Sequence, residues 1–158
     1  MDTERGAVLV LHNVRSAHNV GSIFRTADAA GVSRIFLTGY TPAPVDRFSR
    51  PQRDIAKTAL GAESAVPWEK RASLSTLVAS LKKKDFSIIA LEQGPYAVDY
   101  RVFRPHFPVA LILGNEVRGI DARTLRRCDA VVEIPMRGTK ESLNVSVAAG
   151  VLLFRVLG

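Results

Sequence analysis

Cysteine is nearly absent from this chain of 158 residues, which contains only Cys128. A single cysteine excludes an internal disulfide framework and is typical of a protein in a reducing compartment. The sequence also lacks a run of about eighteen uncharged apolar residues, the length that a transmembrane helix requires. Its amino-terminal stretch, MDTERGAVLVLHNV, has neither the basic region nor the long apolar region of a signal peptide. We therefore expect a cytoplasmic protein that does not span a membrane.

Several common site motifs are missing as well. His12, His18 and His106 show no metal-ligand spacing with the cysteine, so we expect no metal site. The patterns G-x-x-x-x-G-K-[ST] and G-x-G-x-x-G do not occur, which disfavours nucleoside triphosphate and dinucleotide binding. The elbow G-x-S-x-G is absent, which argues against a serine hydrolase.

Positive charge, in contrast, is abundant. The chain has 22 lysine and arginine residues against 15 aspartate and glutamate residues, a formal net charge of +7. Such a surplus serves solubility or attracts a polyanion, because basic side chains that neutralise phosphates release condensed counterions. The stretch RFSRPQRDIAK (47–57) carries four basic residues and one acid, and its proline indicates a loop. Basic residues in a loop favour a polyanionic partner over a merely solvated surface.

Short apolar runs alternate with amphipathic helical patterns along the chain. The runs are nearly continuous in hydrophobicity, as expected for strands that are covered on both faces. They comprise residues 7–12, 34–40, 87–93, 109–116 and 130–136. The helical patterns comprise residues 19–30, 73–84, 121–128 and 142–157. This order predicts one α/β domain over residues 1–158, with a mostly parallel sheet flanked by helices and residues 41–66 as its only long irregular part.

The helix predicted over residues 19–30 carries an arginine away from its buried face. Asn19 is a suitable N-cap and Gly31 a suitable residue to end the helix. The residues at helical spacing that should face the sheet are Val20, Ile23, Phe24, Ala27 and Ala30. Arg25 lies off this stripe and has no carboxylate four residues away. It is either a solvated arginine or part of a site.

Polar residues and glycines gather in the loops that follow the expected strands. The loops are HNVRSAHN, LEQGPY, LGNEVRG and PMRGTKESLN. Because ligands of open α/β sheets bind outside the carboxyl ends of the strands, these four loops indicate one shared site.

Three segments resemble, in order and spacing, the motifs of a known superfamily. NVGSIFRTADAAG (19–31), LILGNEVRGI (111–120) and IPMRGTKESLNVSVAAGVLLF (134–154) are similar to those of the SPOUT S-adenosylmethionine-dependent RNA methyltransferases, in their SpoU/TrmH-type branch. KTALGAESAVPWE (57–69) also resembles a stretch common in that branch. The resemblance extends from about residue 7 to the end of the chain.

This resemblance implies an enzyme that methylates the 2′-hydroxyl of ribose in tRNA or rRNA, with S-adenosyl-L-methionine as cofactor. It also implies a homodimer and a carboxy-terminal deep trefoil knot, with residues 134–150 as the threaded part; general rules of chain topology would not suggest such a knot. Many relatives carry an amino-terminal RNA-binding domain, and we expect none here. The dimer itself would then provide the RNA surface.

The resemblance also implies roles for individual residues. The residues expected at the catalytic centre are Arg25, Asn19, Glu116, Ser142 and Asn144. Those expected to contact the cofactor are Leu91, Glu92, Gln93, Gly114, Asn115, Glu116, Ile134, Pro135, Met136 and Leu143. Those expected to hold the substrate are Arg25, Lys57, Arg118 and Lys140. Arg137 lies in the same loops, and Arg47, Arg50 and Arg53 form a candidate mobile flap on the RNA.

Arg25 has a chemically restricted role in such a reaction. A guanidinium stays protonated in proteins, so we expect it to bind the substrate phosphate and stabilise the developing alkoxide rather than act as a base.

Each of these interpretations has a simpler alternative. Asn19 and Ser142 also suit helix caps alone, Glu116 suits an exposed surface, and Trp68 suits the core as well as stacking on a base. Arg118, Arg137 and Lys140 are equally compatible with solvated loops. For the whole protein, the alternatives are an RNA-binding module of this fold without activity and a base-methylating SPOUT enzyme. The intact first motif with Arg25 argues against the latter.

Overall fold

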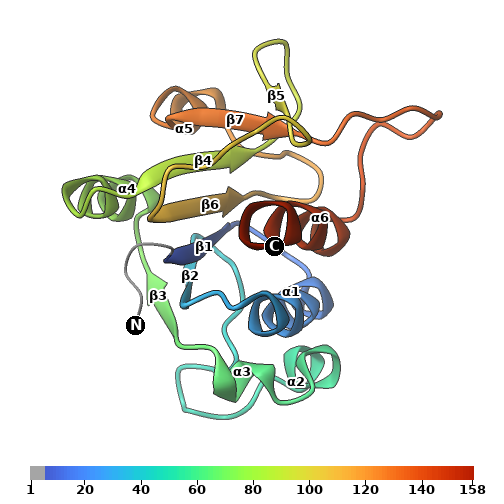
Figure 1. The fold of residues 1–158 in the computed structure, drawn as a ribbon. Coiled ribbons are helices and arrows are strands. Elements are labelled where there is room, and N and C mark those ends of the chain that lie inside the picture. The colour runs from blue at the N-terminus through green and yellow to red at the C-terminus, as the bar shows by residue number, and fades with distance from the viewer. Residues whose placement is uncertain (1–5) are drawn as a thin grey trace.

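A seven-stranded parallel sheet forms the centre of the molecule. The structure is a computed structural model that describes residues 6–158; the expectation about the amino-terminal stretch falls in part on residues 1–5, outside this range. The strands are β1 (Ala7–His12), β2 (Arg34–Thr38), β3 (Trp68–Arg71), β4 (Ser87–Leu91), β5 (Val98–Asp99), β6 (Val109–Leu113) and β7 (Ala130–Glu133). Their order is β3-β2-β1-β6-β4-β7-β5, and every neighbouring pair is parallel. Figure 1 shows this order from β3 at the bottom to β5 at the top.

Helices cover both faces of the sheet. They are α1 (Ala17–Ala30), α2 (Arg53–Ala59), α3 (Ala62–Ala65), α4 (Leu74–Lys83), α5 (Ala122–Arg126) and α6 (Val145–Leu157). Helices α1 and α6 lie side by side on one face, and α4 and α5 lie on the other (Figure 1). The predicted α/β fold with a parallel sheet flanked by helices is confirmed. Within residues 6–158, no helix has both the length and the apolar character to cross a membrane.

Strand β1 shows why its sequence is apolar at successive positions. Leu9 and Leu11 point into the core beneath α1 and α6, whereas Val8 and Val10 point into the core beneath α4. All four are at most 6% exposed. Because successive strand residues point to opposite faces, a strand covered on both sides must be apolar throughout.

The prediction that residues 41–66 are irregular was wrong in part. Helices α2 and α3 lie within this range, and Arg53, which was placed in a loop, begins α2. Ile55 is fully buried, so the stability of α2 comes from packing against the rest of the molecule. Strands β3 and β5, of four and two residues, were also missed.

Two predicted helix caps differ from the structure. Ser16 is the N-cap of α1, and its hydroxyl accepts a hydrogen bond from the Asn19 backbone N–H at 3.2 Å. The N-cap of α6 is Asn144, so this helix begins at Val145, and Ser142 stays in the preceding loop. The predicted end of α1 is confirmed, because Gly31 has a φ of 83° in the left-handed region.

Gly21 sets how closely α2 approaches α1. A Cβ at this position would collide with the Thr58 hydroxyl and the Ile55 carbonyl oxygen of α2. The Thr58 hydroxyl donates to the His18 carbonyl oxygen at 2.9 Å, which fixes the same contact. Glycine is therefore required here by close packing, although it weakens the helix that contains it.

We expect Gly21→Ala to lower the free energy of unfolding by about 1–3 kcal/mol, because the added methyl group meets a backbone carbonyl. The loss of stability is the net effect, after the gain of about 1 kcal/mol that alanine brings over glycine in helix propensity. The matched control is Gly150→Ala in α6, where the nearest atom to the new Cβ is the Thr26 methyl at 3.5 Å. Urea denaturation measures both variants, and equal stability of the two would contradict the packing role of Gly21.

Candidate functional site

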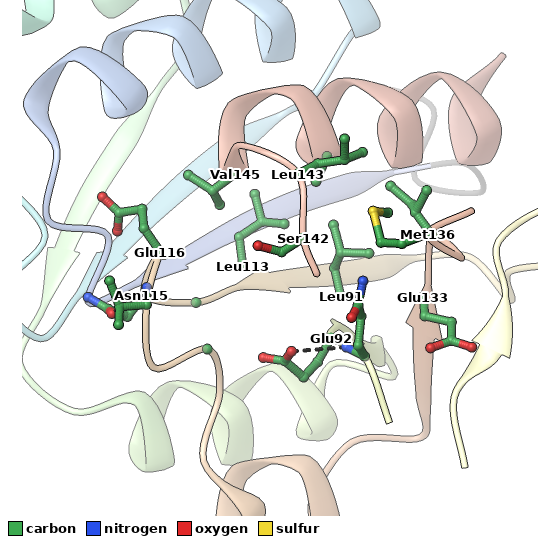
Figure 2. Close-up of a pocket in the computed structure, with 16 residues that line it drawn as sticks. Leu91, Glu92, Leu113, Asn115, Glu116, Glu133, Met136, Ser142, Leu143 and Val145 are labelled. Carbon is green, nitrogen blue, oxygen red and sulfur yellow. Dashed lines mark hydrogen bonds between the residues drawn. The ribbon is translucent and has the colours of Figure 1, made fainter. Parts of the chain in front are cut away.

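A pocket of about 710 Å³, including the open space at its mouth, lies at the carboxyl ends of β4, β6 and β7. Figure 2 shows the strand-end side chains of Leu91 and Glu133 on one side, and Leu143 and Val145 from the start of α6 on the other. The parallel strands bring together loops that are distant in sequence, as the strand-end pattern predicted.

The loop after β6 is held in place by Glu92, which follows β4. One carboxylate oxygen of Glu92 accepts from the Ile120 N–H at 2.8 Å, and the other accepts from the Gln93 N–H at 2.9 Å. Gly119 has a φ of 65°, and a Cβ there would strike the Glu92 carboxylate. Glycine thus allows the backbone to pass directly over this carboxylate.

Asn115 fixes the same loop from within. Its side-chain oxygen accepts from the N–H groups of Val117 and Arg118, at 2.9 and 2.8 Å. Its side-chain nitrogen donates to the Asn13 carbonyl oxygen and the Tyr40 hydroxyl, both at 3.0 Å. These bonds use all the hydrogen-bonding groups of the Asn115 side chain. Asn115 therefore shapes the wall of the pocket rather than offering a free polar group to a ligand.

Glu116 connects the β6 loop to the start of α1. Its two carboxylate oxygens accept from the N–H groups of Arg15 and Ser16, each at 2.9 Å. Burial raises the pKa of Glu116, but these two hydrogen bonds, with a contribution from the Asn19 side chain, bring the pKa below its ordinary value. Glu116 is therefore a carboxylate that binds two backbone N–H groups rather than a solvated surface glutamate.

The first and third motifs meet in a hydrogen bond between two asparagines. The Asn144 side-chain nitrogen donates to the Asn19 side-chain oxygen at 3.2 Å. The Asn144 oxygen meanwhile accepts from the Ser146 N–H at 2.8 Å and caps α6. Asn19, Glu116 and Asn144 thus form a connected polar group beside the pocket.

The structure brings most of the predicted cofactor residues to one place. The pocket is lined by Leu91, Glu92, Gln93, Gly114, Asn115, Glu116, Ile134, Met136 and Leu143. Pro135 is not among the lining residues, although both its neighbours are. Ser142, predicted as catalytic, also lines the pocket. The functional roles of these residues remain predictions.

Sequence reasoning missed several lining residues. They are Leu113, Val117, Gly119, Glu133, Val145 and Ala148. Leu113 and Glu133 are the last residues of β6 and β7, so their position at a strand end was the available signal. Val145 and Ala148 are three apart on α6, and this spacing places both on the face toward the pocket.

None of the predicted substrate residues lines the pocket. Arg25 is exposed on α1, and among residues 6–158 its side chain has no hydrogen bond or ion pair. Lys57 is exposed on α2, and Arg118 and Lys140 are exposed in loops. Trp68 is half-buried and packs against the core, which favours its structural alternative.

No group of three or more histidine, cysteine, aspartate or glutamate side chains in residues 6–158 is placed to hold a metal ion. The prediction that the protein uses no metal is not tested by this observation and remains a prediction.

The Glu116 bonds should make stability depend on pH. Folding lowers the pKa of Glu116, so its carboxylate stabilises the folded state at a pH above the ordinary glutamate pKa of about 4.3. This stabilisation is lost as the pH falls through the pKa that Glu116 has in the folded protein. We expect Glu116→Gln to lower the free energy of unfolding by about 1–2 kcal/mol near neutral pH, because an amide NH₂ would face a backbone N–H. Urea denaturation should show this difference narrowing below about pH 4. Glu141→Gln, in the exposed loop before α6, is the control; a similar loss there would contradict the assignment.

Comparison with known proteins agrees with the motifs and the pocket. A protein named 23S rRNA (guanosine-2'-O-)-methyltransferase RlmB from Ralstonia nicotianae is 37% identical over 95% of this chain and 57% of its own length. The protein of the same name from Xanthomonas axonopodis pv. citri is 36% identical over 97% of this chain and 59% of its own. The chain therefore spans less than two thirds of these relatives.

Solved structures extend the likeness to the fold. An AdoMet-bound rRNA methyltransferase from Sinorhizobium meliloti superposes with a TM-score of 0.85 and 33% identity, over 96% of this chain and 56% of that one. A TrmH/SpoU tRNA modifying enzyme from A. aeolicus superposes with a TM-score of 0.82 and 27% identity, over 97% and 75%. The model of the SpoU rRNA Methylase family matches residues 6–154, nearly the whole described chain. With its motifs in order around one strand-end pocket, this chain belongs to the SpoU rRNA methylase family.

Proposed function

We propose that this chain is the catalytic unit of an RNA methyltransferase that transfers a methyl group from S-adenosyl-L-methionine to a ribose 2′-hydroxyl of rRNA or tRNA. The observation that carries the proposal is the strand-end pocket, next to which the first and third motifs are joined through Asn19 and Asn144. The relatives named as guanosine-2'-O-methyltransferases of 23S rRNA support the reaction and favour rRNA. The likeness to a tRNA modifying enzyme keeps tRNA as a second substrate class.

The lining of the pocket fits this cofactor. Leu91, Leu113 and Met136 provide apolar surface for the adenine ring, and backbone groups at the strand ends suit its polar edge. The carboxylates of Glu92 and Glu133 suit a ligand that carries two positive charges, on its sulfonium and its amino group. When bound, the cofactor supplies the electrophilic methyl group.

The residues of this chain must then orient the ribose oxygen and manage its proton. Ser142 lines the pocket, and Asn144, two residues later, is joined to Asn19 beside it, so we assign these two polar side chains to the ribose. Arg25 binds the neighbouring phosphate and stabilises negative charge on the ribose oxygen. The proton of the 2′-hydroxyl leaves through phosphate or water. Arg118, Lys140 and Lys57 add positive charge for the RNA backbone.

A homodimer completes this proposal. Val147 and Phe154, seven residues apart on α6, are 52% and 54% exposed, and Val151 lies half-buried between them. This apolar stripe on an otherwise buried helix suits a second copy of the chain. Arg25 does not line the pocket of its own chain, which fits an arrangement in which each protomer completes its partner's site. The cytoplasmic location remains part of the proposal.

The carboxy-terminal trefoil knot is likewise part of the proposal. Its support is the sheet order, in which β7 lies between β4 and β5 although it follows both in sequence. After β7 the chain projects outward and returns to α6, which packs beside α1 (Figure 1).

We expect Arg25→Ala to lower the rate of methyl transfer about a hundred- to a thousandfold, the usual effect of removing a group that stabilises an oxyanion. Affinity for S-adenosylmethionine, measured by calorimetry, should be unchanged because Arg25 lies outside the pocket lining. Arg123→Ala on α5, on the opposite face of the sheet, is the control and should keep full activity.

The rate is measured with total RNA and methyl-labelled cofactor, followed by alkaline hydrolysis, because a 2′-O-methyl group protects the adjacent linkage from cleavage. Label in a base would identify a base-methylating enzyme instead. RNA binding without any label would identify an inactive module. Full activity of Arg25→Ala would refute the role of the arginine.

Phe154→Glu should convert the dimer to a monomer, since it places a carboxylate in the apolar stripe of α6. Light scattering should give twice the chain mass of 17.2 kDa for the wild type and the single mass for the variant. Tyr96→Glu, a fully exposed aromatic outside α6, is the control and should remain dimeric. A wild type that is monomeric at micromolar concentration would contradict the proposed dimer.

A further inference from the structure

The loop between β2 and α2 ends in a turn that is built around one carboxylate. Val45 and Pro51 pair as an antiparallel bridge at its base. One oxygen of the Asp46 carboxylate accepts from the N–H groups of Phe48 and Arg50, at 2.8 and 3.0 Å. The other accepts from the Arg50 Nε–H at 2.8 Å. The turn therefore has hydrogen bonds from its own side chains, and the expectation that it acts as a mobile flap remains a prediction.

This turn presents an aromatic ring with two cations close to it. Phe48 is 62% exposed at the tip. The guanidinium carbons of Arg47 and Arg50 lie 4.8 and 5.0 Å from the centre of its ring. A single exposed phenylalanine is ordinary on a protein surface. Here, however, the Asp46 carboxylate fixes the backbone of the turn and two arginines lie against the ring, so the ring is held outward. Phe48 belongs to neither of the two hydrophobic cores in residues 6–158.

The turn is tied to the edge of the sheet that holds the pocket. In the segment that leads into the turn, the buried Thr41 hydroxyl donates to the Leu11 carbonyl oxygen at 2.8 Å and accepts from the Val14 N–H at 3.1 Å. Leu11 and Val14 flank the end of β1, directly before the Arg15 and Ser16 groups that Glu116 binds. The loop that carries the ring is thus hydrogen-bonded, through Thr41, to the end of β1.

We infer that Phe48 is a stacking platform for an unpaired base of the RNA, with Arg47 and Arg50 binding the phosphates beside that base. An aromatic face accepts any base by stacking, and guanidinium groups add both planar surface and charge for the backbone. A base inside a duplex has no free face, so the turn is suited to a single-stranded region of the RNA. The inference rests on the proposed function only in taking the substrate RNA as the strand that is bound.

The test uses the full chain without cofactor and a fluorescently labelled twelve-nucleotide oligouridine, with binding followed by anisotropy. Phe48→Ala should weaken binding about five- to a hundredfold, the loss expected for one stacked base. Phe48→Trp should bind at least as tightly as the wild type, because the flat surface is kept. Phe48→Leu is the matched control: it keeps an apolar side chain without an aromatic face and should behave like the alanine variant.

Asp46→Asn tests the support of the ring. It removes the charge that pairs with Arg50 and sets an amide NH₂ against the Arg50 Nε–H, while the amide oxygen can still accept from the two backbone N–H groups. It should therefore weaken oligouridine binding while cofactor affinity stays unchanged. A long RNA duplex, in which nearly every base is covered on both faces, should bind all of these variants alike.

Wild-type binding by Phe48→Ala, or tight binding by Phe48→Leu, would overturn the inference, as would an equal loss for the duplex. These outcomes are separate from the fate of the proposed function. If no RNA becomes methylated yet Phe48→Ala loses single-strand binding, the enzyme assignment fails and the stacking platform stands. If RNA is methylated and Phe48→Ala binds and reacts like the wild type, only the platform fails.

Discussion

Parallel pairing of all seven strands is the constraint from which the site follows. It places the carboxyl ends of β4, β6 and β7 at one edge, so three loops that are far apart in sequence form a single pocket. It also requires helices on both faces, because strands buried on both sides must be covered. Helices α1 and α6, which carry parts of two of the three motifs, therefore lie on one face of the sheet because that face must be covered.

The loops at this edge owe their shape to a few carboxylate and amide side chains. Glu92 holds the β6 loop against β4, and Glu116 holds the same loop against the start of α1. Each makes its bonds to backbone N–H groups, which orient the chain regardless of neighbouring side chains. A pocket whose wall is mostly backbone and apolar surface is fixed in this way before any ligand binds.

Most of the fold and the content of the pocket were predictable from the sequence, and the exceptions have physical causes. Continuous apolar runs marked five of the seven strands, but β3 and β5 are too short and too polar for that signal. Helix α2 has only seven residues and depends on tertiary packing of Ile55 and Ala59, which no local pattern reveals. The caps were misassigned because Ser16 and Asn19, like Ser142 and Asn144, are equally good capping residues by type. Only the three-dimensional path of the chain decides between them.

The asparagine at position 144 illustrates how two demands narrow the choice of amino acid. The start of a helix accepts serine, threonine, aspartate or asparagine, since each offers an oxygen to the free backbone N–H groups. The neighbouring bond to Asn19 requires a donor on the same side chain. Aspartate has none, and a hydroxyl is too short to serve both directions at once. Among the good capping residues, asparagine alone meets both demands here, so hydrogen bonding and side-chain length constrain the identity of this residue.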